Sequence, residues 1–167
     1  SDVPTDAARA ASMLIVNTPH NPTGAVIDVD GLREIVAFAR EFDLLLVSDI
    51  PYSELVLDDG PPPPSLLSLP GAREITIELQ SLSKSHSMAG WRVGFAVGEA
   101  SLIAHLAKLK SNVDFGMFAA IQRAAAAALD DSETTVALTR ALYRQRAEAV
   151  CAAMASIGWP VRRPRAG

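Results

Sequence analysis

The 167-residue sequence contains a single cysteine, Cys151, so no disulfide can form within the chain. No apolar run approaches the roughly 20 residues of a membrane-spanning helix, and no signal-peptide pattern opens the chain. Positive charge is not in excess, because 15 Lys and Arg residues against 19 Asp and Glu residues give a formal net charge of −4. We therefore expect a cytoplasmic protein that binds neither nucleic acid nor a membrane.

The composition is that of an ordinary globular protein. Hydrophobic residues make up 49% of the chain and charged residues 20%, which is enough apolar material for a core. The sequence has no initiator methionine, and residues 159–167 show no pattern of a domain end. We therefore expect the chain to be a piece of a longer protein.

Short apolar runs alternate with longer helical patterns along the first hundred residues. Strands are predicted at 13–16, 44–47, 75–79 and 94–97. Near-continuous apolar runs of this length are typical of strands buried on both faces. Between the first two strands the apolar residues have helical spacing, with Asp30 as a candidate N-cap. A strand–helix–strand unit predicts a right-handed crossover and parallel pairing.

The second half of the chain is predominantly helical. Helices are predicted at 102–113, 119–129 and 132–154, with Ser132 as a candidate N-cap of the last. The proline-rich stretch 60–65 is predicted to be a surface loop. The fold class is therefore α/β, with a mostly parallel sheet flanked by helices.

Three polar segments follow predicted strands, where ligands of open parallel sheets bind. The first is the turn at 17–24, which two prolines and a glycine make rigid. Because Pro22 holds the backbone of Asn21 extended, the Asn21 amide could face a ligand oxygen. A strand-to-helix turn without a ligand is an equally good interpretation of this segment alone.

The second polar segment begins directly after the apolar run at 44–47. Asp49 lies at the predicted strand tip, and Tyr52 follows close enough to share its site. A carboxylate beside a heterocyclic nitrogen forms a charge-assisted hydrogen bond that keeps the nitrogen protonated. Taken alone, Asp49 is better explained as the cap of a turn.

The third segment, 81–94, has hydroxyl groups, Lys84 and Arg92 between two predicted strands. Serine hydroxyls and an arginine are good phosphate ligands, and a lysine amine can attack a carbonyl group. Gly90 and Gly94 would let the backbone approach a ligand closely. A polar surface loop would not need the neighbouring apolar side chains, so a functional site is favoured here.

Together the three segments resemble a known family. The stretch Ser81-Leu82-Ser83-Lys84 with Gly90-Trp91-Arg92-Val93-Gly94 resembles the cofactor-lysine motif of fold-type I, class I/II aminotransferases. The turn Asn21-Pro22-Thr23-Gly24 and the pair Asp49/Tyr52 resemble two further motifs of that family, in the same order. The resemblance extends from about residue 13 to 167. The sequence around 48–54 and 81–98 is most similar to the branch of diaminopimelate- and alanine-type aminotransferases.

The resemblance implies a pyridoxal 5′-phosphate (PLP) enzyme that moves an amino group between an amino acid and a 2-oxo acid. It implies that residues 1–130 are part of the PLP-binding large domain. Residues 131–167 would form a long helix and the start of a C-terminal small domain. The full-length protein would be a homodimer, and the substrate-binding arginine and further phosphate contacts would lie outside this chain.

The resemblance also assigns roles to individual residues. Lys84 would form the Schiff base with PLP and transfer the substrate α-proton. Asp49 would pair with the pyridine nitrogen, and Tyr52 and Asn21 would bind the 3-oxygen of the ring. Asp49 and Tyr52 are thus expected to take part in catalysis as well as in cofactor binding. No metal is implied.

Three residues would hold the cofactor phosphate, namely Ser81, Ser83 and Arg92. The sequence departs from the family at His86 and Ser87, where close relatives often have a tyrosine and an asparagine. Because neither position is a principal cofactor contact, we interpret this as tolerated variation.

Other functions are compatible with part of the pattern. A PLP-dependent carbon–sulfur lyase of the same fold would share Lys84, Asp49 and Arg92. The effector domain of an aminotransferase-like transcription regulator would need a basic helix-turn-helix upstream, which this sequence does not contain. The presence of all three residues argues against a non-catalytic homologue.

Overall fold

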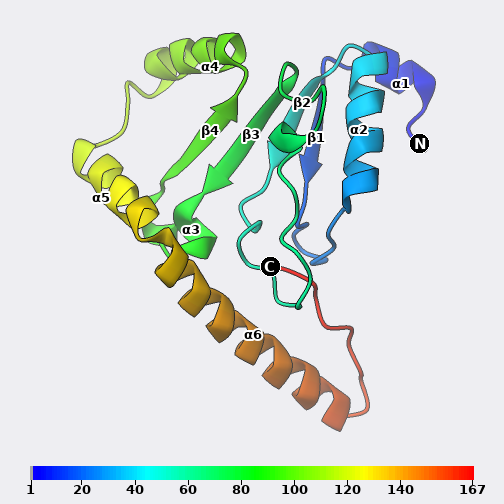
Figure 1. The fold of residues 1–167 in the computed structure, drawn as a ribbon, viewed down its shortest axis with the longest axis vertical. Helices are drawn as coiled ribbons and strands as arrows, with labels where there is room; N and C mark the ends of the chain where they lie inside the picture. The colour runs from blue at the N-terminus through cyan, green and yellow to red at the C-terminus, as the bar shows by residue number, and fades with distance from the viewer. Residues whose placement is uncertain (1) are drawn as a thin grey trace.

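The computed structural model describes residues 2–167, which fold around a four-stranded sheet (Figure 1). The strands lie in chain order, and their bounds are β1 Met13–Asn17, β2 Leu45–Asp49, β3 Thr76–Ser81 and β4 Gly94–Gly98. β1, β2 and β3 are mutually parallel, and β4 is antiparallel to β3. The predicted α/β class with a mostly parallel sheet is confirmed.

The helix between the first two strands, α2, covers Val29–Glu41. Its N-cap is Asp28, whose carboxylate accepts a hydrogen bond from the Gly31 backbone N–H at 2.9 Å. The prediction of Asp30 as N-cap was wrong, because the helix begins earlier and Asp30 lies in its first turn, where it forms an ion pair with Arg33. Leu32 on α2 is fully buried against the sheet, in the largest apolar cluster of the structure.

The remaining helices are α1 Thr5–Ala10, α3 Leu82–Ser85, α4 Ala100–Val113, α5 Ala119–Asp130 and α6 Ser132–Ser156. The three helices predicted after residue 98 are therefore confirmed, and residues 60–65 contain no helix or strand. Ser132 is the first residue of α6 rather than its N-cap, a position held by Asp131 without a side-chain capping bond. None of the helices within residues 2–167 is long and apolar enough to cross a bilayer.

The outer strands are only partly covered by this chain, so burial on both faces was not a correct prediction for them. On β1, Val16 is buried toward α2, but Met13 and Ile15 on the opposite face are 49% and 63% exposed. On β4, Phe95 and Val97 are each 40% exposed. Side chains alternate between the two faces of a strand, so each outer strand presents a row of apolar side chains that residues 2–167 cover only in part.

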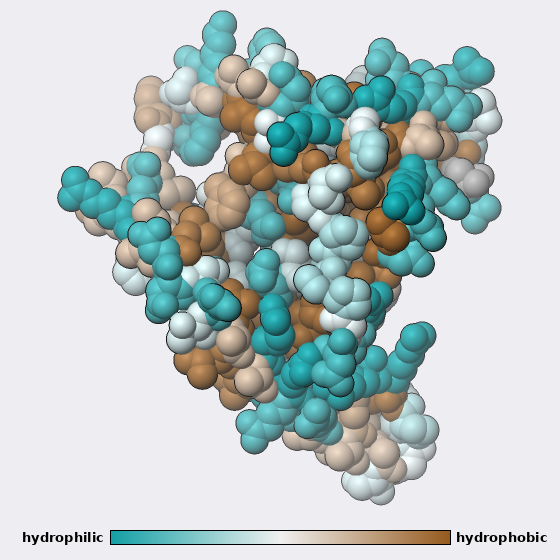
Figure 2. Space-filling model, in the orientation of Figure 1, coloured by the Kyte–Doolittle hydropathy of each residue, from teal (hydrophilic) through white to brown (hydrophobic). Residues whose placement is uncertain are grey.

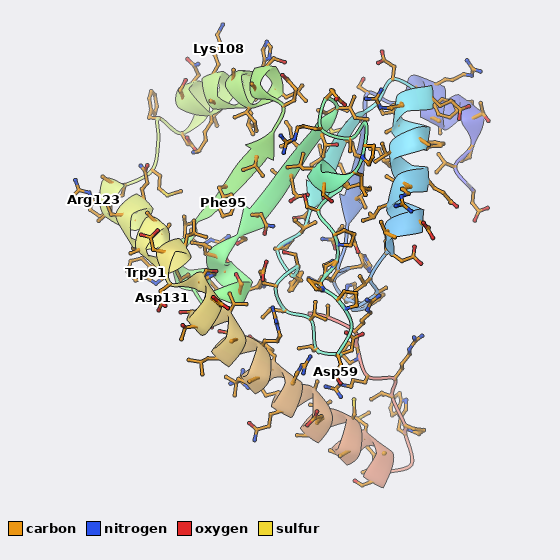
Figure 3. All side chains as sticks on the ribbon, in the orientation of Figure 1. Asp59, Trp91, Phe95, Lys108, Arg123 and Asp131 are labelled. Atoms are coloured by element: carbon orange, nitrogen blue, oxygen red, sulfur yellow. The ribbon has the colours of Figure 1, made fainter. Side chains whose placement is uncertain are left out.

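The last residues of the chain return to the loop that follows β2. Ala166 forms an antiparallel bridge with Val56, and the Leu57 backbone N–H donates to the Arg165 carbonyl at 2.9 Å. α6 is also tied to the loop after β2, since Arg144 forms an ion pair with Asp59 at 3.0 Å. Figure 3 shows Asp59 on this loop beside α6. The loop after β2 is thereby held between α6 and the final segment.

Glu78 is a buried acid in the middle of β3, with 4% of its surface exposed. The Ser65 hydroxyl donates to its carboxylate at 2.9 and 3.0 Å, and backbone N–H groups of Leu66 and Leu67 also interact with it. Burial raises the pKa of Glu78 above its ordinary value, and these hydrogen bonds offset only part of the shift. The carboxylate therefore joins the start of the turn at 66–68 to the sheet, but its ionised form is destabilised by burial.

This destabilisation predicts a pH dependence of stability. Because the folded state raises the pKa of Glu78, the free energy of unfolding should fall as pH rises above about 4.5, where the acid ionises in the unfolded chain. Glu78→Gln removes the titrating group and should flatten this decline between pH 4.5 and neutrality, measured by urea unfolding at several pH values. Glu41→Gln, at an exposed position, is the control. An unchanged slope in Glu78→Gln would contradict the assignment.

Candidate active site

The three polar segments meet at one edge of the sheet, where β1, β2 and β3 end and β4 begins. The last residues of β1 and β2, Asn17 and Asp49, are register partners, and β3 ends at Ser81. Because β4 is antiparallel, it begins at this edge with Gly94 opposite Ser81, which brings Arg92 to the same place. The topology thus gathers the segments that the sequence places up to 75 residues apart, from 17 to 92.

Asp49 is half-buried at the tip of β2 and is held by a neighbour that the sequence analysis did not select. The Asn17 amide nitrogen, Nδ2, donates to the Asp49 Oδ2 atom at 3.1 Å and to the Asp49 carbonyl at 2.9 Å. The Asn17 Oδ1 atom accepts a hydrogen bond from the Asn21 backbone N–H at 3.1 Å. In the sequence Asn17 marks only the end of a strand, since the pairing that brings it to Asp49 is non-local.

Lys84 lies in the single turn of α3, directly after β3. The Ser81 hydroxyl caps this turn by accepting a hydrogen bond from the Ser83 backbone N–H at 3.1 Å. The Lys84 Nζ atom is 5.3 Å from the centroid of the Tyr52 ring, within the range of a cation–π contact. Within residues 2–167 Lys84 forms no ion pair with a carboxylate. Its amine therefore lies against an aromatic face rather than on an acid.

Arg92 is exposed two residues before β4, with a left-handed backbone conformation of φ 52°. One of its nitrogens, Nη1, donates to the Ala89 carbonyl at 3.0 Å. No other hydrogen bond of this guanidinium group is present in the part of the chain that the structure describes. Most of its donors are therefore available to an anion.

The two glycines of this segment differ in what they permit. A Cβ atom on Gly94 would lie 2.5 Å from the Gln80 carbonyl oxygen, whereas a Cβ atom on Gly90 would meet nothing within 4 Å. The close approach that Gly94 allows is therefore to the backbone of β3, not to a ligand as expected from the sequence. Gly94 matters to the site because it lets β4 pair closely with the strand that leads to Lys84.

A cavity of about 240 Å³ opens beside this edge of the sheet. Asn21 and Tyr52 line it together with His20 and with Pro164 and Ala166 of the last segment. The structure thus brings the two residues predicted to bind the same ring oxygen into one cavity wall. The other predicted site residues do not line this cavity, and they are Asp49, Ser81, Ser83, Lys84 and Arg92.

The departure from the family motif at His86 is accommodated in the interior. His86 is 9% exposed, and its Nδ1 atom forms a hydrogen bond of 2.8 Å with the Ser85 hydroxyl. Ser87, by contrast, is exposed in a left-handed conformation with φ 54°.

Comparisons with known proteins give a consistent picture. The family model described as aminotransferase class I and II matches residues 3–167. LL-diaminopimelate aminotransferase 2 of Trichormus variabilis is 46% identical over 164 residues, which are 98% of this chain and 42% of that protein. The chain thus spans about two fifths of the length of such relatives.

Solved structures show the same likeness. A probable N-succinyldiaminopimelate aminotransferase from Thermus thermophilus matches with a TM-score of 0.84 and 39% identity, over 92% of this chain and 41% of that chain. N-succinyldiaminopimelate aminotransferase from Mycobacterium tuberculosis matches with a TM-score of 0.88 and 34% identity, over 99% of this chain and 44% of that chain.

The contrast between the two glycines predicts different tolerance to a methyl group. Gly94→Ala should lower the free energy of unfolding by about 1–3 kcal/mol, because the Cβ atom collides with the β3 backbone. Gly90→Ala should change it by less than about 0.5 kcal/mol, since its surroundings are open. Both values come from denaturant unfolding curves. Equal effects of the two substitutions would show that β3 and β4 are not packed as described.

Proposed function

Because this chain belongs to the class I and II aminotransferases, we propose that the complete protein transfers an amino group between an amino acid and a 2-oxo acid, with PLP as cofactor. The observation that supports this most directly is the position of Lys84. Its amine lies against Tyr52 at the sheet edge where Asp49 ends the neighbouring strand.

The donor set at this edge fits PLP. When bound, PLP supplies an electron sink for the carbanion that forms at the substrate α-carbon. Lys84 offers an amine without a competing acid, as the covalent partner of an aldehyde requires. Within residues 2–167 only the Oδ2 atom of the Asp49 carboxylate accepts a hydrogen bond, so Oδ1 is available to a protonated ring nitrogen.

The remaining residues have the chemistry to orient the same group. Asn21 and Tyr52, which share a cavity wall, would donate to the 3-oxygen of the ring. The hydroxyl groups of Ser81 and Ser83 and the free donors of Arg92 would hold the phosphate. Together these residues would hold the group at the strand tips.

Lys84 would also move the proton on which the transfer depends. Once released, its Nζ atom would act as the base that takes the proton from the substrate α-carbon, and the protonated amine would then be the acid that returns a proton to complete the transfer. The Asp49 carboxylate would keep a ring nitrogen protonated, and this would favour the drawing of negative charge away from the α-carbon. The neighbouring Tyr52 ring stabilises the lysine as a cation between these steps.

The family and the relatives also support proposals about domains, substrate and location. We propose that residues 1–130, of which the structure describes all but the first, are part of a PLP-binding large domain. Residues 131–167 would begin a C-terminal small domain. LL-diaminopimelate is the first amino acid to test, because the relatives reported above are named for diaminopimelate compounds. We place the protein in the cytoplasm.

We also propose a homodimer. Phe115 and Phe118, in the connection between α4 and α5, are 91% and 73% exposed. Leu109 and Val113, in the last turns of α4, are exposed beside them. Figure 2 shows apolar surface on the α4–α5 side of the molecule. An apolar patch of this kind is typical of an interface, and a second copy of the chain is the partner that the family resemblance implies.

Amino transfer is favoured over carbon–sulfur cleavage. A lyase of the same fold would use Lys84 and Asp49 in the same positions, so the cofactor site does not separate the two reactions. The relatives reported above are all named aminotransferases. Release of ammonia and a 2-oxo acid without an amino acceptor would instead identify the lyase.

The first test is the covalent link. After borohydride reduction of the complete protein with PLP, mass spectrometry should locate the cofactor on the peptide that contains Lys84. Lys84→Ala should abolish this label and lower the rate of amino transfer by about 1,000-fold or more. Lys108→Ala is a matched control, since Figure 3 shows Lys108 on the outer side of α4, away from the sheet. Wild-type turnover in Lys84→Ala would disprove the assignment.

Replacement of Asp49 should lower kcat more than it weakens the binding of PLP. Asp49→Ala is expected to lower kcat by about 100-fold or more, because the ring nitrogen loses the carboxylate that keeps it protonated. The Kd for PLP should rise by no more than about tenfold, since the phosphate contacts of Ser81, Ser83 and Arg92 remain. Steady-state kinetics and a spectroscopic titration measure the two quantities. Equal losses in both would argue against Asp49 as the partner of the ring nitrogen.

A further inference from the structure

The Asn17 side chain is the hub of a small network at the strand tips. Asn17 and Asp49 are adjacent register partners at the ends of parallel strands, so their side chains emerge on the same face. Asn17 is half-buried there and contacts both Asp49 and the backbone of Asn21. These contacts are not required to end a strand, so they indicate a further role for Asn17.

The three hydrogen bonds fix the orientation of the amide. Its Oδ1 atom must face the Asn21 N–H, because a backbone N–H can only donate. The Nδ2 atom then faces the Asp49 carboxylate and the Asp49 carbonyl, which only accept. The amide nitrogen is therefore directed at Asp49, and a flipped amide would lose all three contacts.

We propose that Asn17 is a positioning residue for Asp49, and this inference rests on the proposed function. By holding Oδ2, the amide stops rotation of the carboxylate and presents Oδ1 to the ring nitrogen of the cofactor. A charge-assisted hydrogen bond of this kind is among the stronger polar contacts in proteins.

The same side chain couples two cofactor contacts. Through Oδ1, Asn17 sets the backbone position of Asn21, the residue proposed to bind the 3-oxygen. Through Nδ2 it sets the carboxylate proposed to bind the ring nitrogen. One amide would therefore position both the residue proposed to bind the ring nitrogen and the residue proposed to bind the 3-oxygen.

The test distinguishes this role from one in which Asn17 only stabilises the turn after β1. The complete protein is freed of cofactor and titrated with PLP and with its carbocyclic analogue, in which a C–H group replaces the ring nitrogen. Wild type should prefer PLP, because only PLP can donate to Asp49. Asn17→Ala and Asn17→Leu should reduce this preference about five- to tenfold. Their Kd for the analogue should change by less than about threefold.

Two controls make the result specific. In the Asp49→Ala background, Asn17→Ala should cause no further loss of preference, because the carboxylate that it orients is absent. Gln145→Ala, which removes an exposed amide from α6, should leave both affinities unchanged. Melting temperatures of the cofactor-free variants report on folding.

The possible failures are distinguishable. If wild type does not bind PLP covalently, the proposed function fails. If wild type binds PLP but the Asn17 variants weaken both cofactors equally, or weaken neither, the positioning role is wrong. If neither Asn17 variant folds, the role is also wrong, because a positioning residue leaves the fold intact.

Discussion

The parallel register of β1, β2 and β3 is the constraint on which the site depends. In-register pairing of Asn17 with Asp49 and of Asp49 with Leu79 brings the three carboxyl ends to one edge. The backbone ladder holds these ends rigidly, so a carboxylate and an amide can be placed to within hydrogen-bond tolerance of each other. Lys84 and Tyr52 lie just beyond the strands, on short segments that the ladder also positions.

Buried strands and the chemistry that follows them could be predicted from local sequence. The run at 44–47 is apolar because β2 lies in the centre of the sheet, and polar side chains return where the strands end. The helices after residue 98 were predictable from spacing alone. The first residues of the helices could not be predicted in this way. Asp28 and Asp30 have the same capping chemistry, and only the backbone conformation decides which of them is the N-cap.

Contacts between segments distant in the chain could not be predicted from local sequence. Asn17 meets Asp49 across a strand pair, and Gly94 meets the Gln80 carbonyl across another. The packing of Ala166 on Val56 joins residues 110 positions apart in the chain. The exposed faces of β1 and β4 were also unpredictable, because an apolar strand has the same sequence whether or not its cover lies in the same chain.

We propose that the strand register presents the Asp49 carboxylate to the ring nitrogen of PLP. A crystal structure of the complete protein with PLP bound tests this most directly, through the distance from Asp49 Oδ1 to that nitrogen. We predict about 2.7–2.9 Å, as for a charge-assisted hydrogen bond, with Asn17 Nδ2 still on Oδ2. A ring nitrogen that faces solvent or another side chain would contradict the account.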